Sequence, residues 1–297
     1  MSVVVVGSAN VDLTITGERL PAPGETVAAE RYEETPGGKG LNQAVAASRA
    51  GADVSFFHAV GNDSGATFLA DFLSGESLTP RVSVADLPTG RAFIEVDAEG
   101  QNSIMVVGGA NTAFEQWPDP GIEEAIAQSY FLVLQQEVSP TLNLHLAALA
   151  NTLDTRVVLT PAPVENMSPS ILSFVDILIL NEHESSLLGG NPDPRLAASK
   201  LSAGKTLILT RGAAGATLFR SGEAIADFAS PRVRVKDTTG AGDCFVGNYI
   251  ARKVAGAPEA EAIQAACDAA AVSVTRIGAA PAMPTAEELP HHSQKGS

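Results

Sequence analysis

The stretch VVVVGSANVD, residues 3–12, decides the fold class. Its four valines form a continuous apolar run of strand length. A run without polar alternation is typical of a strand that is buried on both faces of a parallel sheet. Polar residues follow at once, where such a strand would end. Similar runs recur at Val54–Val60, Tyr130–Leu134, Val157–Thr160, Asp176–Leu180 and Thr206–Thr210.

Helical patterns separate these runs. The helix-typical spacing i, i+3, i+4, i+7 begins at Leu41 and again at Val246. Buried strands that alternate with helices predict an α/β fold, with a doubly wound, mainly parallel central sheet flanked by helices. We expect a single domain of this kind to span residues 1–297.

Two regions alternate apolar and polar residues instead. One is Val11–Thr16, and the other is Ala92–Asp97, which the turn-rich AEGQN joins to Ser103–Val107. The alternation predicts half-exposed antiparallel strands and a hairpin. We expect a small accessory sheet, with strands within about 11–34 and 91–108, that acts as a lid over an active site. The alternative is a plain extension of the sheet edge.

The composition excludes several partners. The 297 residues carry 19 Lys and Arg against 34 Asp and Glu, a net charge of −15, which disfavours nucleic acid and anionic membranes. No apolar run approaches the roughly 20 residues of a membrane span. Cys244 and Cys267 form neither a disulfide framework nor a metal-binding spacing. We therefore expect a cytoplasmic protein. Separately, we expect the proline-rich, polar segment from Pro281 to be frayed.

Polar clusters follow the predicted strands. They read GSANVD, QQE, PAP, NEHE and RGAAG, each directly after an apolar run. In open parallel sheets, ligands bind outside the carboxyl ends of the strands, so we expect one shared cleft. Asn10, Asp12, Asn42 and Glu137 offer the mixture of donors and acceptors that a polyhydroxylated ligand needs.

The stretch DTTGAGDCF, residues 237–245, joins an anion site to a carboxylate. It leads into a helical pattern from Cys244, and a helix N-terminus presents free N–H groups and the positive end of its dipole. Gly240 and Gly242 let those amides turn towards an anion. Asp243 is either a favourable helix-start residue or a general base. Phosphoryl transfer needs both an anion hole and a base, which favours a kinase.

Other nucleotide motifs fail. AGKT at residues 203–206 has Ser199 in place of the first glycine of a P-loop and precedes a strand. No GxGxxG follows the first strand, which disfavours a dehydrogenase. The glycine-rich TPGGKGLNQA, residues 35–44, instead permits close approach of a ligand at the start of a helix, with Lys39 as a donor. The alternative is a tight turn with a solvated lysine.

Together, PGGKGLNQA and DTTGAGDCF resemble the motifs of the ribokinase family of sugar kinases, also called the phosphofructokinase B family. The resemblance covers nearly the whole chain, from GSANVD to VTRIGAAP, and includes PAPGETV and GGAN. It implies transfer of phosphate from ATP to the 5-hydroxyl of D-ribose, with Mg²⁺, K⁺ and a homodimer formed through the lids. Ala9 and Thr160 depart from the family pattern, so another sugar or a nucleoside is an alternative substrate. A catalytically silent sugar- or nucleotide-binding protein is the alternative of another class.

The resemblance also implies roles for individual residues. Asp243 is expected to be the base, and the anion hole is expected at Gly240, Ala241 and Gly242. Sugar contacts are expected at Asn10, Asp12, Gly38, Lys39, Asn42, Glu137 and Asp243. Nucleotide and Mg²⁺ contacts are expected at Asn181, Glu184, Thr210, Gly212, Gly215, Gly242 and Cys267. The K⁺ loop is expected at Asp237, Thr239, Ser273, Arg276 and Gly278.

Overall fold

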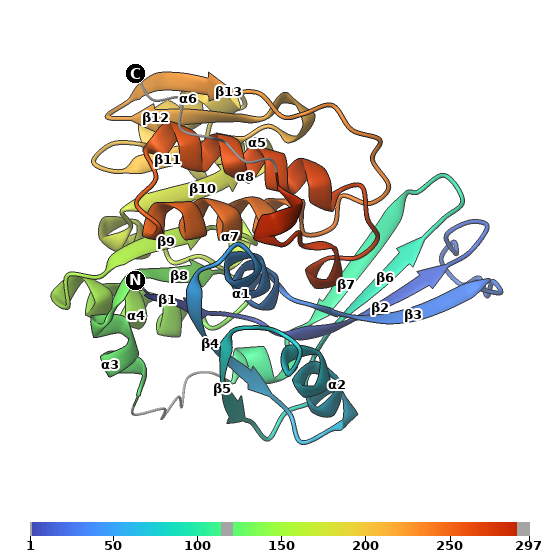
Figure 1. Ribbon diagram of the computed structural model, residues 1–297. Helices are drawn as coiled ribbons and strands as arrows, with labels where there is room; N and C mark the ends of the chain where they lie inside the picture. Colours follow the sequence, from blue (N-terminus) through green and yellow to red (C-terminus); the bar gives the residue numbers. More distant parts are fainter. Residues whose placement is uncertain (1, 114–120, 290–297) are drawn as a thin grey trace.

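The computed structural model describes residues 2–113 and 121–289, which fold around a nine-stranded sheet (Figure 1). The strand order is β13-β12-β11-β10-β9-β8-β1-β4-β5, and the strands from β11 to β5 are parallel. The predicted fold class is therefore confirmed. The strands are β1 (Ser2–Val6), β4 (Asp53–Val60), β5 (Thr79–Val84), β8 (Ser129–Gln135), β9 (Arg156–Thr160), β10 (Ile177–Asn181), β11 (Thr206–Thr210), β12 (Ala216–Arg220) and β13 (Glu223–Phe228).

Helices cover both faces of this sheet (Figure 1). One face carries α1 (Lys39–Arg49), α2 (Ser64–Leu73), α7 (Ala241–Val254) and α8 (Glu259–Ser273). The other carries α3 (Ile122–Ala127), α4 (Pro140–Thr152), α5 (Glu182–Gly189) and α6 (Pro194–Leu201). Short 3₁₀ turns lie at Gly109–Thr112, Val164–Asn166, Pro169–Phe174, Gly212–Ala214, Ala280–Ala282 and Ala286–Glu288. Among the described residues, no helix has the length and apolar character needed to cross a membrane.

Helix α1 is the central element of its layer. Every residue from Gly40 to Ser48 is buried, because the sheet lies on one side of the helix and α7 lies on the other. Gly247 lets the two helices approach, since a Cβ there would lie 2.5 Å from the Cβ of Ala46. This close contact holds the N-terminal ends of α1 and α7 side by side.

A second, four-stranded sheet extends away from the body (Figure 1). The predicted hairpin between β6 and β7 is confirmed. The predicted antiparallel pairing is found between β2 and β3 and between β6 and β7, but β2 and β6 pair in parallel: Asn10 lies opposite Gly90, and both strands run outward from the body. The strands, in sheet order, are β3 (Arg31–Gly37), β2 (Asn10–Thr16), β6 (Gly90–Val96) and β7 (Asn102–Val107).

The segment after Pro281 was expected to fray, and as far as residue 289 this is wrong. Met283 and Leu289 are buried in the main core. Arg49, at the end of α1, forms an ion pair with Glu76 and also donates hydrogen bonds to this segment. The accepting carbonyl oxygens belong to Ala280, Pro281 and Met283, at 3.2, 3.3 and 2.8 Å.

Candidate active site

Three parallel strands end at one cavity. Thr160, Asn181 and Thr210 are the last residues of β9, β10 and β11, and all three line a space of about 180 Å³. Helices α1 and α7 point their N-terminal ends at the same space, which Lys39 and Ala241 also line. The cavity thus lies at the carboxyl edge of the sheet, where α/β folds bind ligands.

The N-terminus of α7 forms one wall of the cavity. The sequence pattern placed the helix from Cys244, but it begins at Ala241, so Asp243 is the third helical residue. Gly240 caps the helix with a left-handed φ of 72°, and a Cβ there would lie 3.0 Å from the Cβ of Ala279. A Cβ on Gly242 would meet no atom within 4 Å, so its backbone is open to the cavity. The N–H of Ala241 already donates to the carbonyl oxygen of Thr238 at 3.2 Å, so an anion at this turn would be received by the other N–H groups of the turn, such as that of Gly242.

Asp243 lies at the junction of α7 and α1. Its side chain is 7% exposed and accepts hydrogen bonds from two neighbouring amides of α1. Asn42 Nδ2 donates to Oδ2 at 3.1 Å, and Gln43 Nε2 donates to Oδ1 at 2.9 Å. Burial raises the pKa of Asp243, whereas the charge of Lys39 and the two amide donors oppose that rise. A carboxylate with a raised pKa at a helix N-terminus is suited to accept a proton.

Further carboxylates surround Lys39, although Asp12 and Glu137 are not among the residues that line the cavity. Asp12 is 8% exposed, and burial, followed by the charges of Glu137 and Asp243, raises its pKa to about 7. Burial lowers the pKa of Lys39, but the neighbouring carboxylates outweigh it and raise the pKa overall. Four carboxyl groups, those of Asp12, Glu137, Glu184 and Asp243, act on this one ammonium, which disfavours an anionic ligand beside it and suits a neutral one with several hydroxyl groups.

The backbone around these groups is tightly fitted. Gly38 has a φ of 92°, and a Cβ there would lie 3.0 Å from the carbonyl oxygen of Ser8. Glu137 accepts hydrogen bonds from the Ser8 hydroxyl at 2.6 Å and from the Lys39 backbone N–H at 3.0 Å. The side chain of Asn111 donates to that of Asn10 at 2.7 Å. Glu137 and Asn10 are thus held in place beside Lys39, but neither they nor Asp12, Gly38 and Asn42 are among the residues that line the cavity.

Asn42 has an unused acceptor. Its Oδ1 atom is buried and has no hydrogen-bond partner within the described part of the chain. A buried amide oxygen without a partner is unfavourable, so it indicates a place for a ligand donor such as a hydroxyl group.

Asn181 and Glu184 lie on the opposite side of the cavity. They form a capping box at the start of α5: the Asn181 side chain accepts from the Glu184 N–H, and the Glu184 carboxylate accepts from the Asn181 N–H, both at 2.9 Å. No group of three or more His, Cys, Asp or Glu side chains in the described residues could hold a metal alone. One carboxylate beside a phosphate pocket nevertheless fits Mg²⁺, which usually arrives with substrate phosphates.

Three predicted nucleotide residues do not line this cavity. Gly212 and Gly215 form the turn between β11 and β12, where Gly215 has a φ of 89° and a Cβ would lie 1.9 Å from the carbonyl oxygen of Phe228. Cys267 is buried in the core beside α8 residues, and burial raises its pKa to about 12. The fold explains each of these residues without a ligand, so their contact with a nucleotide remains a prediction.

The predicted K⁺ loop is partly assembled. Asp237 accepts hydrogen bonds from the Thr239 N–H and the Gly278 N–H, both at 2.9 Å. Burial opposes ionisation of Asp237, but these bonds and one from the Thr239 hydroxyl lower its pKa. The side chain of Ser273 donates to a helix carbonyl, and that of Arg276 pairs with Glu288. Arg276 could therefore offer a cation only its main-chain oxygen, whereas the Ser273 hydroxyl keeps its oxygen lone pairs.

Ser8, Gln43 and Asn111 are site residues that the sequence interpretation missed. Each forms a hydrogen bond with a predicted site residue: Ser8 with Glu137, Gln43 with Asp243, and Asn111 with Asn10. All three lie in motifs from which the sequence interpretation used only the glycines or the family resemblance. The uncharged polar side chains beside those glycines were the only signal.

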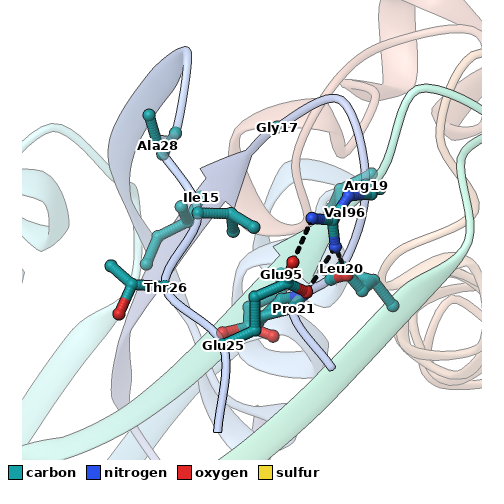
Figure 2. Close-up of a pocket in the computed structure, with 12 residues that line it drawn as sticks. Ile15, Gly17, Arg19, Leu20, Pro21, Glu25, Thr26, Ala28, Glu95 and Val96 are labelled. Atoms are coloured by element: carbon teal, nitrogen blue, oxygen red, sulfur yellow. Dashed lines mark hydrogen bonds and ion pairs between the residues drawn. The ribbon is translucent and has the colours of Figure 1, made fainter. Parts of the chain in front are cut away.

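A larger cavity of about 360 Å³ lies in the second sheet and does not suit phosphoryl transfer (Figure 2). Figure 2 shows Arg19 and Glu25 pointing towards each other and joined by contacts, so their charges are already matched. Its other walls are mainly apolar, including Ile15, Pro21 and Val96. The smaller cavity at the sheet edge is therefore the candidate active site.

Comparison with known proteins agrees with this assignment. Residues 1–286 match the family described as pfkB family carbohydrate kinase. A ribokinase of Haemophilus influenzae is 37% identical over 299 residues, covering 97% of this chain and 96% of its own. A ribokinase of Staphylococcus aureus is 36% identical over 298 residues, covering 97% and 98%. The structure of Arabidopsis thaliana ribokinase complexed with ribose and ATP has a TM-score of 0.87 at 31% identity and covers 96% of each chain.

The chain belongs to the pfkB family of carbohydrate kinases. The class that the two glycine-rich motifs predicted, a sugar kinase of this family, is thereby confirmed.

Proposed function

We propose that this chain phosphorylates D-ribose at its 5-hydroxyl with ATP. The observation that carries the proposal is a buried carboxylate, Asp243, in the same helix turn as the open backbone of Gly242. The relatives named ribokinase, and the ribose and ATP in the Arabidopsis structure, supply the identity of the substrates.

Each side of the cavity has one task in this proposal. Asp243 takes the proton of the 5-hydroxyl as that oxygen bonds to the γ-phosphorus, and ADP leaves as its bond to the γ-phosphoryl group breaks. The amides from Gly240 to Gly242 stabilise charge on the phosphoryl oxygens. The sugar is held by Asn10, Asp12, Gly38, Lys39, Asn42 and Glu137.

Metal ions complete the nucleotide side. Asn181 and Glu184 are the residues that would hold Mg²⁺, which would neutralise charge on the phosphates when bound. Asp237, Thr239 and Gly278, with main-chain oxygens from residues 273–278, would hold K⁺. Thr210, Gly212, Gly215 and Cys267 would lie along the nucleotide. A cytoplasmic location, expected from the sequence, is part of the same proposal.

We also propose a homodimer formed through the lids. Four consecutive apolar side chains of β7, from Ile104 to Val107, are each more than half exposed, and a surface of this kind is typical of a contact with another chain. Light scattering should give twice the chain mass of 30.5 kDa. A single-chain mass at working concentration contradicts this part of the proposal.

ADP release measured with ATP, Mg²⁺ and K⁺ tests the activity. The acceptors are D-ribose, 2-deoxyribose, fructose, adenosine and pseudouridine. We expect rapid turnover with ribose and slow turnover with the others. Faster turnover with another acceptor would change the assigned substrate but leave the kinase activity standing. No turnover with any of them would favour a catalytically silent binding protein.

A further inference from the structure

Two neighbouring amides on α1 hold Asp243, but they are bound very differently. Gln43 uses its whole amide group. Its Nε2 atom donates to Asp243 Oδ1 at 2.9 Å and lies 3.5 Å from Thr160 Oγ1, while its Oε1 atom accepts from Gln135 Nε2 at 2.8 Å. Asn42 donates to Oδ2 at 3.1 Å, and its own Oδ1 has no partner within the described residues. Gln43 is therefore fixed, and Asn42 can turn.

The main chain of Gln135 is held in turn by the sheet, whereas its side-chain Oε1 is buried and has no hydrogen-bond partner within the described residues. It is the last residue of β8 and is fully buried, and its backbone oxygen accepts from Asn143 Nδ2 at 2.6 Å. Its side chain occupies space that a Cβ on Gly7 would take, since that Cβ would lie 2.0 Å from Gln135 Oε1. The sequence thus leaves room at Gly7 for an amide that reaches Gln43.

The direction of the Gln43 amide matters for Asp243. An ionised carboxylate only accepts hydrogen bonds, so the NH₂ end of Gln43 must face it. Gln135 donates to the other end of the same amide, which favours this orientation over the flipped one. A flipped amide would place its oxygen against a carboxylate oxygen, in a buried site where such repulsion is strong.

We propose that Gln43 and Gln135 are positioning residues, a buried two-amide relay that anchors Asp243 Oδ1 and leaves Oδ2 to take the proton of the sugar hydroxyl. This inference rests on the proposed function, in which Asp243 is the base. Asn42 turns its amide towards the sugar, where its free Oδ1 gains a donor, and Oδ2 gives up one hydrogen bond for the attacking hydroxyl. The relay keeps the carboxylate oriented during that exchange.

Methionine substitutions test the relay, because methionine fills a similar volume and offers no amide. Gln43→Met, Gln135→Met and the double variant are compared with wild type by kcat, KM for sugar and ATP, and the pH dependence of kcat. Loss of a hydrogen bond to a charged group should lower kcat about tenfold in Gln43→Met, with KM for the sugar little changed. The acidic side of its pH profile of kcat should move to higher pH. Loss of a donor destabilises the ionised form of Asp243 and thereby raises the pKa of this carboxyl group. Gln135→Met should shift kcat and the acidic side of the profile in the same directions.

The double variant separates a relay from two independent effects. If Gln135 acts through Gln43, adding Gln135→Met to Gln43→Met should leave kcat unchanged. The matched control is Asn248→Leu, which removes a buried amide of α7 that donates to the Cys244 carbonyl at 2.9 Å and does not touch Asp243. We expect it to lower the unfolding temperature without moving the pH profile.

Two results overturn the relay. One is a wild-type kcat and pH profile in Gln43→Met, and the other is multiplication of the two effects in the double variant. If Gln43→Met does not fold, an unchanged pH profile in Gln135→Met is decisive by itself, because Gln135 does not contact Asp243. All variants are assayed with whichever sugar the wild-type protein phosphorylates. Failure of ribose as a substrate then shows in the wild-type protein, and failure of the relay shows only in the variants.

Discussion

The two sides of the active-site cavity differ in the groups that form them: side chains on one side and main chain on the other. The side proposed to hold the sugar consists of charged and amide side chains, with Lys39 at the cavity wall and Asp12 and Glu137 behind it. The phosphate side consists of backbone at a helix N-terminus, with Gly240 and Gly242 in place of side chains. Hydroxyl groups need directed donors and acceptors, whereas a phosphoryl group in transfer needs a broad region of positive potential. The difference teaches that selectivity and charge stabilisation are carried by separate parts of one cavity.

The largest effect should come from Asp243, where the two sides meet. Asp243→Asn removes the base and should lower kcat by at least about 100-fold, while leaving the binding of sugar nearly intact. Steady-state kinetics and calorimetric titration with ribose measure the two quantities. Turnover close to that of the wild-type protein would remove Asp243 from the mechanism.

On the phosphate side, two glycines should respond differently to alanine. Gly240→Ala forces a positive φ and a contact with Ala279, so it should lower the free energy of unfolding by about 1 kcal/mol or more. Gly242→Ala has room in the fold and should keep its stability, but its methyl group should hinder the anion hole and lower kcat/KM for ATP about tenfold. Urea unfolding and ATP kinetics on both variants check this. Equal losses of stability would show that the two glycines have the same structural role.

The monovalent cation should have a smaller effect than loss of the base, because the predicted loop lies outside the residues that line the cavity. Replacing K⁺ with tetramethylammonium should lower kcat. Asp237→Ala should lower kcat in K⁺ and make the enzyme indifferent to the cation. Titrating KCl at constant ionic strength measures both effects, and a wild-type enzyme that does not respond to K⁺ contradicts the assignment.

On the sugar side, the effect of Asp12 on the pH dependence of stability should be the smallest of these changes. Its pKa of about 7 lies above the ordinary value of 3.8, so its contribution to stability is fully present below about pH 4 and is lost as pH rises towards 7. Asp12→Asn should therefore weaken the fall of unfolding free energy between these pH values. Urea unfolding of both proteins at a series of pH values gives the difference. Identical pH dependence would mean that Asp12 is ionised throughout.

Local patterns predicted the parts of this fold that local chemistry determines. Continuous apolar runs located six parallel strands, because burial on both faces removes polar alternation. The edge strand β5 was missed, since Thr79–Val84 contains Pro80 and Arg81 and half of its pairing is absent. The antiparallel strands β12 and β13 were missed too, and the lid strand β3 runs from Arg31 to Gly37, beyond the predicted limit of about residue 34.

The site residues, too, divide into those that local patterns predicted and those that only the fold brings together. The glycines and the acid of residues 240–243 predicted a helix N-terminus with a carboxylate, because one short segment carries both. The amides that hold Asp243 were not predicted. Gln43 lies 200 positions from Asp243 in the chain, and Gln135 lies 92 positions from Gln43. Their contacts depend on how α1, α7 and β8 come together, which no local periodicity records.

Strand β2 runs without interruption from Asn10, at the body of the molecule, to Thr16 in the outer sheet. It carries Asn10 and Asp12 as part of the same pleated unit that pairs with β3 and β6, while β9, β10, β11 and α7 belong to the body of the molecule. A related protein in which the outer sheet is altered or replaced can therefore bind a different acceptor molecule. The phosphate-binding residues of the body need not change with it. The architecture makes new substrate preferences accessible by exchanging one module, without rebuilding the chemistry.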